Sequence, residues 1–216
     1  VETARKRGRI LVLGTEFAFL PACHALHAEI AAASNDGREI RLIWNDPQSE
    51  IRHGAFKVRH TEVSLLIDLL PHAASIFRIY SGAAGLNVVG AQMSQDGSNG
   101  TIDFRDQSGR RYHLEAGSKS AARMRSLQTG KPGSGIHIDF SARQTAVLID
   151  GKTRTLGDGV TGMDSVMRLE LGAFIHEIDK RPQVGSTGAI ASEILDLQAQ
   201  LENILLPPES GTDPHA

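Results

Sequence analysis

The sequence of 216 residues predicts an α+β domain in which a predominantly antiparallel, mixed sheet carries its helices on one face. Three observations support this fold class. A run of short strand-like segments with turns rich in Gly, Asn and Asp fills the middle of the chain. A long apolar segment with helical character precedes this run, and two amphipathic segments follow it. Strands this short, joined by tight turns, favour an antiparallel meander over parallel repeats.

The composition is typical of a soluble globular protein and excludes several classes of partner. With 40% hydrophobic residues, 22% charged residues and a net charge of −2, the chain favours neither nucleic acid nor a membrane surface. No apolar run approaches the roughly 20 residues needed to span a bilayer. The single cysteine, Cys23, permits no intramolecular disulfide, so a reducing cytoplasm is the expected compartment. We expect no metal site, because Cys23, His24 and His27 lack a second ligand pair at zinc-binding spacing.

Three elements are predicted in the first 45 residues. Residues 1–8 have the basic character of a helix end, and residues 9–14 (RILVLG) have the pattern of a short buried strand. Residues 22–33 are predicted as a helix that a proline opens. Residues 38–45 alternate as a second strand, which the following Asp-Pro pair closes.

Candidate substrate-binding residues lie at the end of that second strand and beyond it. We interpret Trp44 as a core residue, because large aromatic side chains are usually buried. Asn45 is a candidate substrate-binding residue, since it ends the strand where side chains often reach a cleft. The polar stretch 48–60 is predicted as a loop or weak strand, and His53 within it is a second candidate.

The apolar segment 61–81 (TEVSLLIDLLPHAASIFRIYS) contains the candidate catalytic pair. Asp68 and His72 lie four residues apart, a spacing that places both side chains on one face of a helix. An imidazole oriented by a carboxylate suits proton transfer near neutral pH, although an ordinary helical pair has the same spacing. Pro71 either kinks this helix or lies in the first turn of a helix that begins near Asp68.

Short strands are predicted after this helix, at residues 85–95, 100–106, 110–117, 135–140, 144–150 and 152–156. Asp150-Gly151 has the sequence of a two-residue hairpin turn. The basic segment 118–130 is interpreted as a solvated loop or an edge strand in preference to a phosphate site.

Two amphipathic helices are predicted to close the domain, at residues 163–180 and 187–206. The first has four apolar residues spaced for one buried face, namely Val166, Leu169, Ala173 and Ile178. Residues 1–206 therefore form a single domain, and residues 207–216 are expected to be a disordered tail. Helices on one face leave the other sheet face to water or to a second copy of the chain, and we expect a homodimer through that face.

The order of these features resembles the C-terminal portion of the Gfo/Idh/MocA family of NAD(P)-dependent oxidoreductases. The matching order is GRILVLG, FAFLPACHAL, a strand ending in WNDP, the Asp68–His72 element, the strand meander and the closing helix pair. The resemblance implies a mixed-sheet domain that shapes a substrate site and often builds the oligomer. It implies a sugar-like, polyol or carbonyl small-molecule substrate and NAD or NADP as the cofactor. His72 would be the general acid/base or a substrate ligand, with Asp68 beside it.

The sequence also departs from the family pattern. Leu70 stands where Gly is usual, and Glu16 and Ala18 stand where Asn and Arg are usual, so Glu16 becomes a candidate substrate-binding residue. No G-x-G-x-x-G follows a strand near the start of the chain, so no cofactor-binding residue is assigned. We therefore expect a substrate domain whose Rossmann half is missing and which does not turn over alone. The alternative is a stand-alone, non-catalytic domain for ligand binding or dimerisation.

Overall fold

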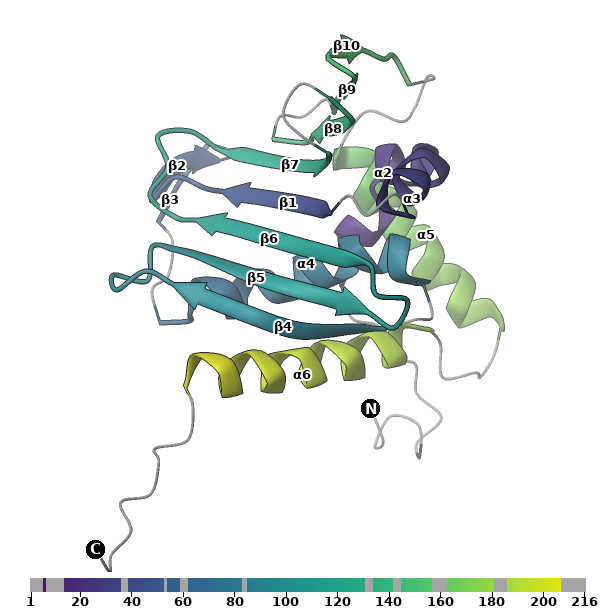
Figure 1. Cartoon of the computed structure of the whole chain (residues 1–216). Coiled ribbons are helices and arrows are strands. Elements are labelled where there is room, and N and C mark those ends of the chain that lie inside the picture. Colours follow the sequence, from purple (N-terminus) through teal and green to yellow (C-terminus); the bar gives the residue numbers. More distant parts are fainter. Residues whose placement is uncertain are drawn as a thin grey trace, which may run out of the picture.

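The computed structural model of the chain describes residues 6, 14–35, 39–52, 54–58, 62–82, 85–130, 134–141, 145–156, 163–180 and 186–206. Its centre is an eight-stranded sheet with the strand order β10-β9-β8-β7-β1-β6-β5-β4 (Figure 1). β1 pairs in parallel with β6 and antiparallel with β7. The remaining neighbours pair antiparallel, which confirms the predicted α+β class with a predominantly antiparallel mixed sheet.

The strands of this sheet are β1 (Ile40–Asn45), β4 (Leu86–Met93), β5 (Asn99–Asp106), β6 (Arg111–Gly117), β7 (Met124–Thr129), β8 (Ile136–Asp139), β9 (Ala146–Ile149) and β10 (Lys152–Thr153). A separate hairpin consists of β2 (Ser49–Arg52) and β3 (Ala55–Val58). The helical elements are η1 (Glu16–Phe19), α2 (Pro21–Ala25), α3 (His27–Asn35), α4 (Leu65–Ser81), α5 (Met163–Lys180) and α6 (Ser186–Leu205).

The core lies between the sheet and α4, which passes behind the strands in Figure 1. Along β1, Ile40, Leu42 and Trp44 alternate onto the helix-covered face and are buried. Phe77 of α4 packs against Phe104, with ring centroids 5.5 Å apart. Burying a side chain of this size contributes about 1.5–3 kcal/mol.

α6 lies along β4, the edge strand of the sheet (Figure 1). An edge strand presents unpaired backbone groups, and two side chains of α6 accept two of its N–H donors. Glu193 Oε1 accepts from Leu86 N at 3.0 Å, and Gln200 Oε1 accepts from Val88 N at 2.8 Å. The closing helix therefore protects the strand as well as the core.

The helix that carries Asp68 and His72 begins before Asp68, contrary to the predicted alternative of a start near that residue. α4 starts after Ser64, and the N–H of Asp68 donates to the Ser64 carbonyl at 3.0 Å. Pro71 is thus inside the helix and not in its first turn. The start near Asp68 is wrong, because the apolar residues Leu65 and Leu66 gain more by burial in a helical turn than they would in a loop.

Two other predictions are wrong, and one is confirmed. The basic segment 118–130 contains β7, an interior strand between β1 and β8, and not an edge strand. Leu169 of α5 is exposed, whereas Val166 is buried as predicted. Asp150 and Gly151 both have positive φ, at 49° and 76°, which is the backbone of the predicted hairpin turn.

Several expectations fall outside the described residues. They are the tail at 207–216 and, apart from Lys6 and Gly14, the helix end at 1–8 and the strand at 9–14. None of the helices among the described residues is both long enough and apolar enough to cross a membrane.

Candidate functional site

Two aromatic rings from separate parts of the chain contact His72, and a third packs behind them. Its imidazole stacks on the indole of Trp44 from β1, with ring centroids 5.2 Å apart and 3° between the ring planes. Phe17 of η1 meets the imidazole edge-on at 5.1 Å and meets Trp44 at 4.8 Å. Phe140, which follows β8, lies 6.1 Å from Trp44. Offset and edge-on contacts of this kind are the preferred arrangements of aromatic rings, so they hold the imidazole in one orientation.

Trp44 is held in turn by Arg125 and Asp46. Arg125 stands opposite Trp44 in the β1–β7 pair, and its Cζ lies 4.2 Å from the centroid of the indole. Asp46 accepts hydrogen bonds from Arg125 Nε at 3.1 Å and from Arg125 Nη2 at 2.6 Å. It also accepts from Trp44 Nε1 at 3.1 Å. A bidentate guanidinium–carboxylate pair is geometrically specific, so Asp46 is fixed, and the indole cannot rotate away from His72 without breaking its own hydrogen bond to Asp46.

Asp46 is ionised at neutral pH although it is largely buried. Burial raises the pKa of its carboxyl group, but the hydrogen bond and charge of Arg125, together with Trp44 and Arg123, outweigh that effect. The net pKa lies below the usual value. Arg123 Nε lies 3.3 Å from Asp46 Oδ1, and the same guanidinium pairs with Glu50. The cations and anions of this network therefore compensate one another.

His72 is neutral at pH 7. Burial lowers the pKa of its imidazole, the Glu16 carboxylate opposes that effect, and the Arg125 charge lowers the pKa further. Asp68 and Asp46 raise it, but the net shift is downward. Among the described residues, none donates to or accepts from a ring nitrogen of His72. A neutral imidazole whose nitrogens make no such bond can take a proton from a bound molecule.

A cleft of about 200 Å³ lies beside this frame. Trp44 and Arg125 line it from the sheet, Asp68 from α4, and Glu50 and Val58 from the β2–β3 hairpin. The volume is below the range of about 300–1,000 Å³ that drug-sized ligands occupy, so the cleft suits a small molecule.

The structure brings together some of the predicted site residues and separates others. Asp68 is exposed at the cleft one turn before His72, without a hydrogen bond between them in the described part. Glu16 is close enough to His72 to affect its charge. Asn45 lies on the opposite face of the sheet, because successive side chains of β1 alternate, and it lines a separate cavity there with Asn99. His53 lies outside the described residues.

The sequence reasoning missed the residues that hold His72 in place. Trp44 was correctly interpreted as buried, but its contact with His72 joins residues that are 28 positions apart in the numbering. The composition around Arg125 predicts a solvated loop or an edge strand, and the Asp46-Pro47 pair indicates only the end of a strand. The alternation of β7, in which Arg125 and Leu127 share a face, was the available signal.

The described residues do not fit a dinucleotide site. Such a site needs a glycine-rich turn between a parallel strand and a helix. The G-x-G-x-x-G spacing does occur at residues 157–162, far from the chain start, in a stretch that lies outside the described residues. The strand before it is β10, a two-residue antiparallel edge strand. This topology is not the βαβ unit that holds a pyrophosphate.

Comparison of the sequence with protein-family models and with curated proteins gives no match. The structure, however, resembles solved sugar dehydrogenases and ketoreductases. UDP-N-acetylglucosamine 3-dehydrogenase GnnA from Acidithiobacillus ferrooxidans has a TM-score of 0.61 and 17% identity, over 94% of this chain and 65% of that chain. This chain has the fold of the C-terminal part of Gfo/Idh/MocA oxidoreductases.

Two further structures support the same assignment of the fold. D-galactose-1-dehydrogenase from Rhizobium etli has a TM-score of 0.55 and 17% identity, over 92% of this chain and 62% of that chain. KijD10, a 3-ketoreductase from Actinomadura kijaniata in complex with NADP, has a TM-score of 0.60 and 14% identity, with the same coverage. The chain thus spans less than two thirds of the length of these proteins.

Proposed function

We propose that this chain is the substrate-binding part of an NAD(P)-dependent oxidoreductase that acts on a sugar-like polyol or the corresponding carbonyl compound. The observation that carries the proposal is the neutral imidazole of His72, which is fixed by Phe17 and stacks on Trp44, a residue that lines a small polar cleft. The structural neighbours, which are sugar dehydrogenases and a ketoreductase, support the same reaction class.

In this proposal His72 exchanges a proton with a substrate hydroxyl group. In the oxidative direction a ring nitrogen of His72 accepts the hydroxyl proton, and in the reductive direction the imidazolium returns it. Glu16 and Asp68 stabilise the imidazolium, since both carboxylates favour its charged form. The described residues do not fit NAD(P), so this chain supplies the proton-transfer side of the reaction only.

The charges of the cleft favour a neutral polyhydroxylated substrate over an anionic one. Asp46, Glu50 and Asp68 line it, and the guanidinium of Arg125 is paired with Asp46. Carboxylates only accept hydrogen bonds, and sugar hydroxyls donate them. The exposed carboxylate of Asp68, which has no ion pair among the described residues, is the group we expect to hold a substrate hydroxyl.

The test is turnover by the native polypeptide that contains this chain, followed by the absorbance of NADH or NADPH with a panel of neutral and phosphorylated sugars. We expect His72→Asn to lower kcat by about 10²- to 10⁴-fold in a chain that stays folded, the usual contribution of a general base. His27→Gln, on α3 away from the cleft, is the matched control. Turnover that survives His72→Asn would refute the role of His72. Sugar binding without turnover of either cofactor would favour a non-catalytic binding domain.

A further inference from the structure

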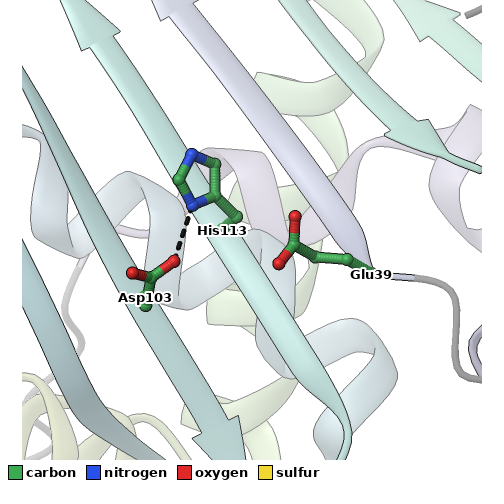
Figure 2. A group of neighbouring side chains, drawn as sticks. All are labelled: Glu39, Asp103 and His113. Atoms are coloured by element: carbon green, nitrogen blue, oxygen red, sulfur yellow. Dashed lines mark hydrogen bonds and ion pairs between the residues drawn. The ribbon is translucent and has the colours of Figure 1, made fainter. Parts of the chain in front are cut away.

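The sheet face opposite the helices, which the described residues leave uncovered, carries a second group of chemically active side chains. Because side chains alternate along a strand, this group lies on the other face from Trp44. His113 of β6 stands directly opposite Asp103 of β5, and Glu39 immediately precedes β1. Figure 2 shows the three side chains directed toward one another over the sheet. Residues of three neighbouring strands thus place one imidazole and two carboxylates together.

The geometry of this group suits a small cation. His113 Nδ1 lies 2.7 Å from Asp103 Oδ1, and one potential ligand atom from each of the three residues lies within 4.8 Å of the others. The His113 side chain is 16% exposed, whereas those of Asp103 and Glu39 are 50% and 30% exposed. The imidazole is therefore anchored, and the two carboxylates have freedom to adjust.

We propose that Glu39, Asp103 and His113 bind a divalent first-row cation, with Zn²⁺ as the best match. A neutral imidazole and two carboxylates are ligands that zinc accepts at about 2.0–2.2 Å, with water in the fourth position. Tetrahedral bonds of that length put donors about 3.4 Å apart, so rotation of the half-exposed carboxylates closes the gap. The two carboxylate charges balance the charge of the ion.

Gly90 of β4 leaves room for this arrangement. It pairs with Asp103, and a Cβ at Gly90 would lie 3.3 Å from Asp103 Oδ2. That contact is tighter than most real Cβ contacts, so a larger residue would press on the carboxylate. The glycine keeps the second oxygen of Asp103 free to move toward an ion.

Arg41 competes with the ion for Glu39. Its guanidinium lies 3.8 Å from Glu39 Oε1, and the residue stands opposite His113 in the β1–β6 pair. The Arg41 side chain is 47% exposed, so the pair is weak and the guanidinium can move into water when a divalent ion arrives. Removal of this charge is therefore expected to tighten metal binding.

The test uses the full chain after dialysis against EDTA, with isothermal titration of ZnCl₂ and a thermal melt. We expect the unmutated chain to bind one equivalent of Zn²⁺ and His113→Gln to bind none at this site. In the unmutated chain, Zn²⁺ at a hundredfold excess over Kd should raise the Tm by about 5–10 °C, and it should not raise the Tm of His113→Gln. His137→Gln is the matched control, because His137 lies on the same sheet face, on β8, and should leave this equivalent intact. Arg41→Gln should lower Kd about tenfold.

Two results would overturn the proposal. One is an unchanged stoichiometry in His113→Gln, which would place the zinc on other histidines. The other is the absence of binding at millimolar ZnCl₂. Asp103→Asn provides a second variant if His113→Gln unfolds, and Co²⁺ absorption reports tetrahedral nitrogen–oxygen coordination directly. None of these readouts depends on the proposed oxidoreductase activity, so the two proposals fail or stand separately.

Discussion

His72 is the residue whose surroundings differ most from those of an ordinary helical histidine. Burial against Trp44 and Phe17 disfavours its charge, while Glu16 and Asp68 favour it. Because the two influences oppose each other, the imidazole stays neutral at rest and can still become charged when a substrate gives up a proton. The same balance makes the stability of the fold depend on pH.

We predict that the free energy of unfolding falls as the pH drops from 7.5 to 5. The folded pKa of His72 lies below its usual value of 6.5. As the pH falls through 6.5, the unfolded chain therefore binds a proton before the folded chain does. This proton uptake stabilises the unfolded state relative to the folded state. His72→Phe keeps the ring contacts and removes the proton site, so its stability should fall less over this interval. Urea unfolding at both pH values measures the difference. Identical losses in the two proteins would contradict the lowered pKa.

Asp46 should matter for stability because it is the common acceptor for Trp44 and Arg125. Asp46→Ala leaves the largely buried guanidinium of Arg125 without this partner, and we expect a loss of about 1.5–3 kcal/mol by urea unfolding. Lys119→Ala is the control, since its ion pair with Asp96 is half-exposed and should cost about 0–1 kcal/mol. Equal effects in the two variants would mean that the Asp46 network is no more than a surface feature.

At the scale of elements, α6 has a role that its amphipathic pattern does not reveal. Its apolar face, with Ile194, Leu197 and Leu201, is buried as the spacing of the sequence indicates. Its polar residues Glu193 and Gln200 pair with the backbone of β4. A helix and an edge strand that are far apart in the sequence therefore form one unit.

This unit can be tested by hydrogen exchange. In Gln200→Ala the amide of Val88 loses its acceptor, so it should exchange about tenfold faster, as expected for the loss of a bond worth roughly 1–1.5 kcal/mol. The amide of Ile102 in the interior strand β5 should not change. Faster exchange at both amides would indicate general destabilisation and would argue against a local role of Gln200.

At the scale of the whole molecule, the sheet has one face covered by helices and one face that the described residues leave open (Figure 1). The open face is mainly polar and includes Arg41, Asn45, Thr101, His113 and Glu115. A polar face of this kind can remain in water or can meet a second copy through hydrogen bonds and ion pairs.

The homodimer remains a prediction. Light scattering on the chain should give twice the mass of the monomer at micromolar concentration, and Thr101→Lys in the centre of the open face should give the monomer at an unchanged Tm. A polar interface should weaken in high salt. A monomer at all concentrations and salt levels would show that the open face is only solvated.

The sequence by itself determined the fold class of this protein and most of its elements. The spacing of apolar residues, the Asp150-Gly151 turn and the proline and glycine stops are local signals, and they act within a few residues. They sufficed for the meander, the closing helices, the α+β class and the choice of Asp68 and His72 as a candidate pair. They also sufficed for the resemblance in order, which the structural neighbours support at the level of the fold.

Only the tertiary structure decided which side chains meet. The sequence placed residues 118–130 in a loop or at an edge, because their basic residues resemble a solvated stretch; pairing with β1 turned Arg125 toward Trp44. The spacing of Cys and His residues in the sequence predicts no metal site, yet the sheet register places His113 beside Asp103 and near Glu39. Strand order depends on the free energy of the whole core, to which distant residues contribute together, so no local pattern encodes it.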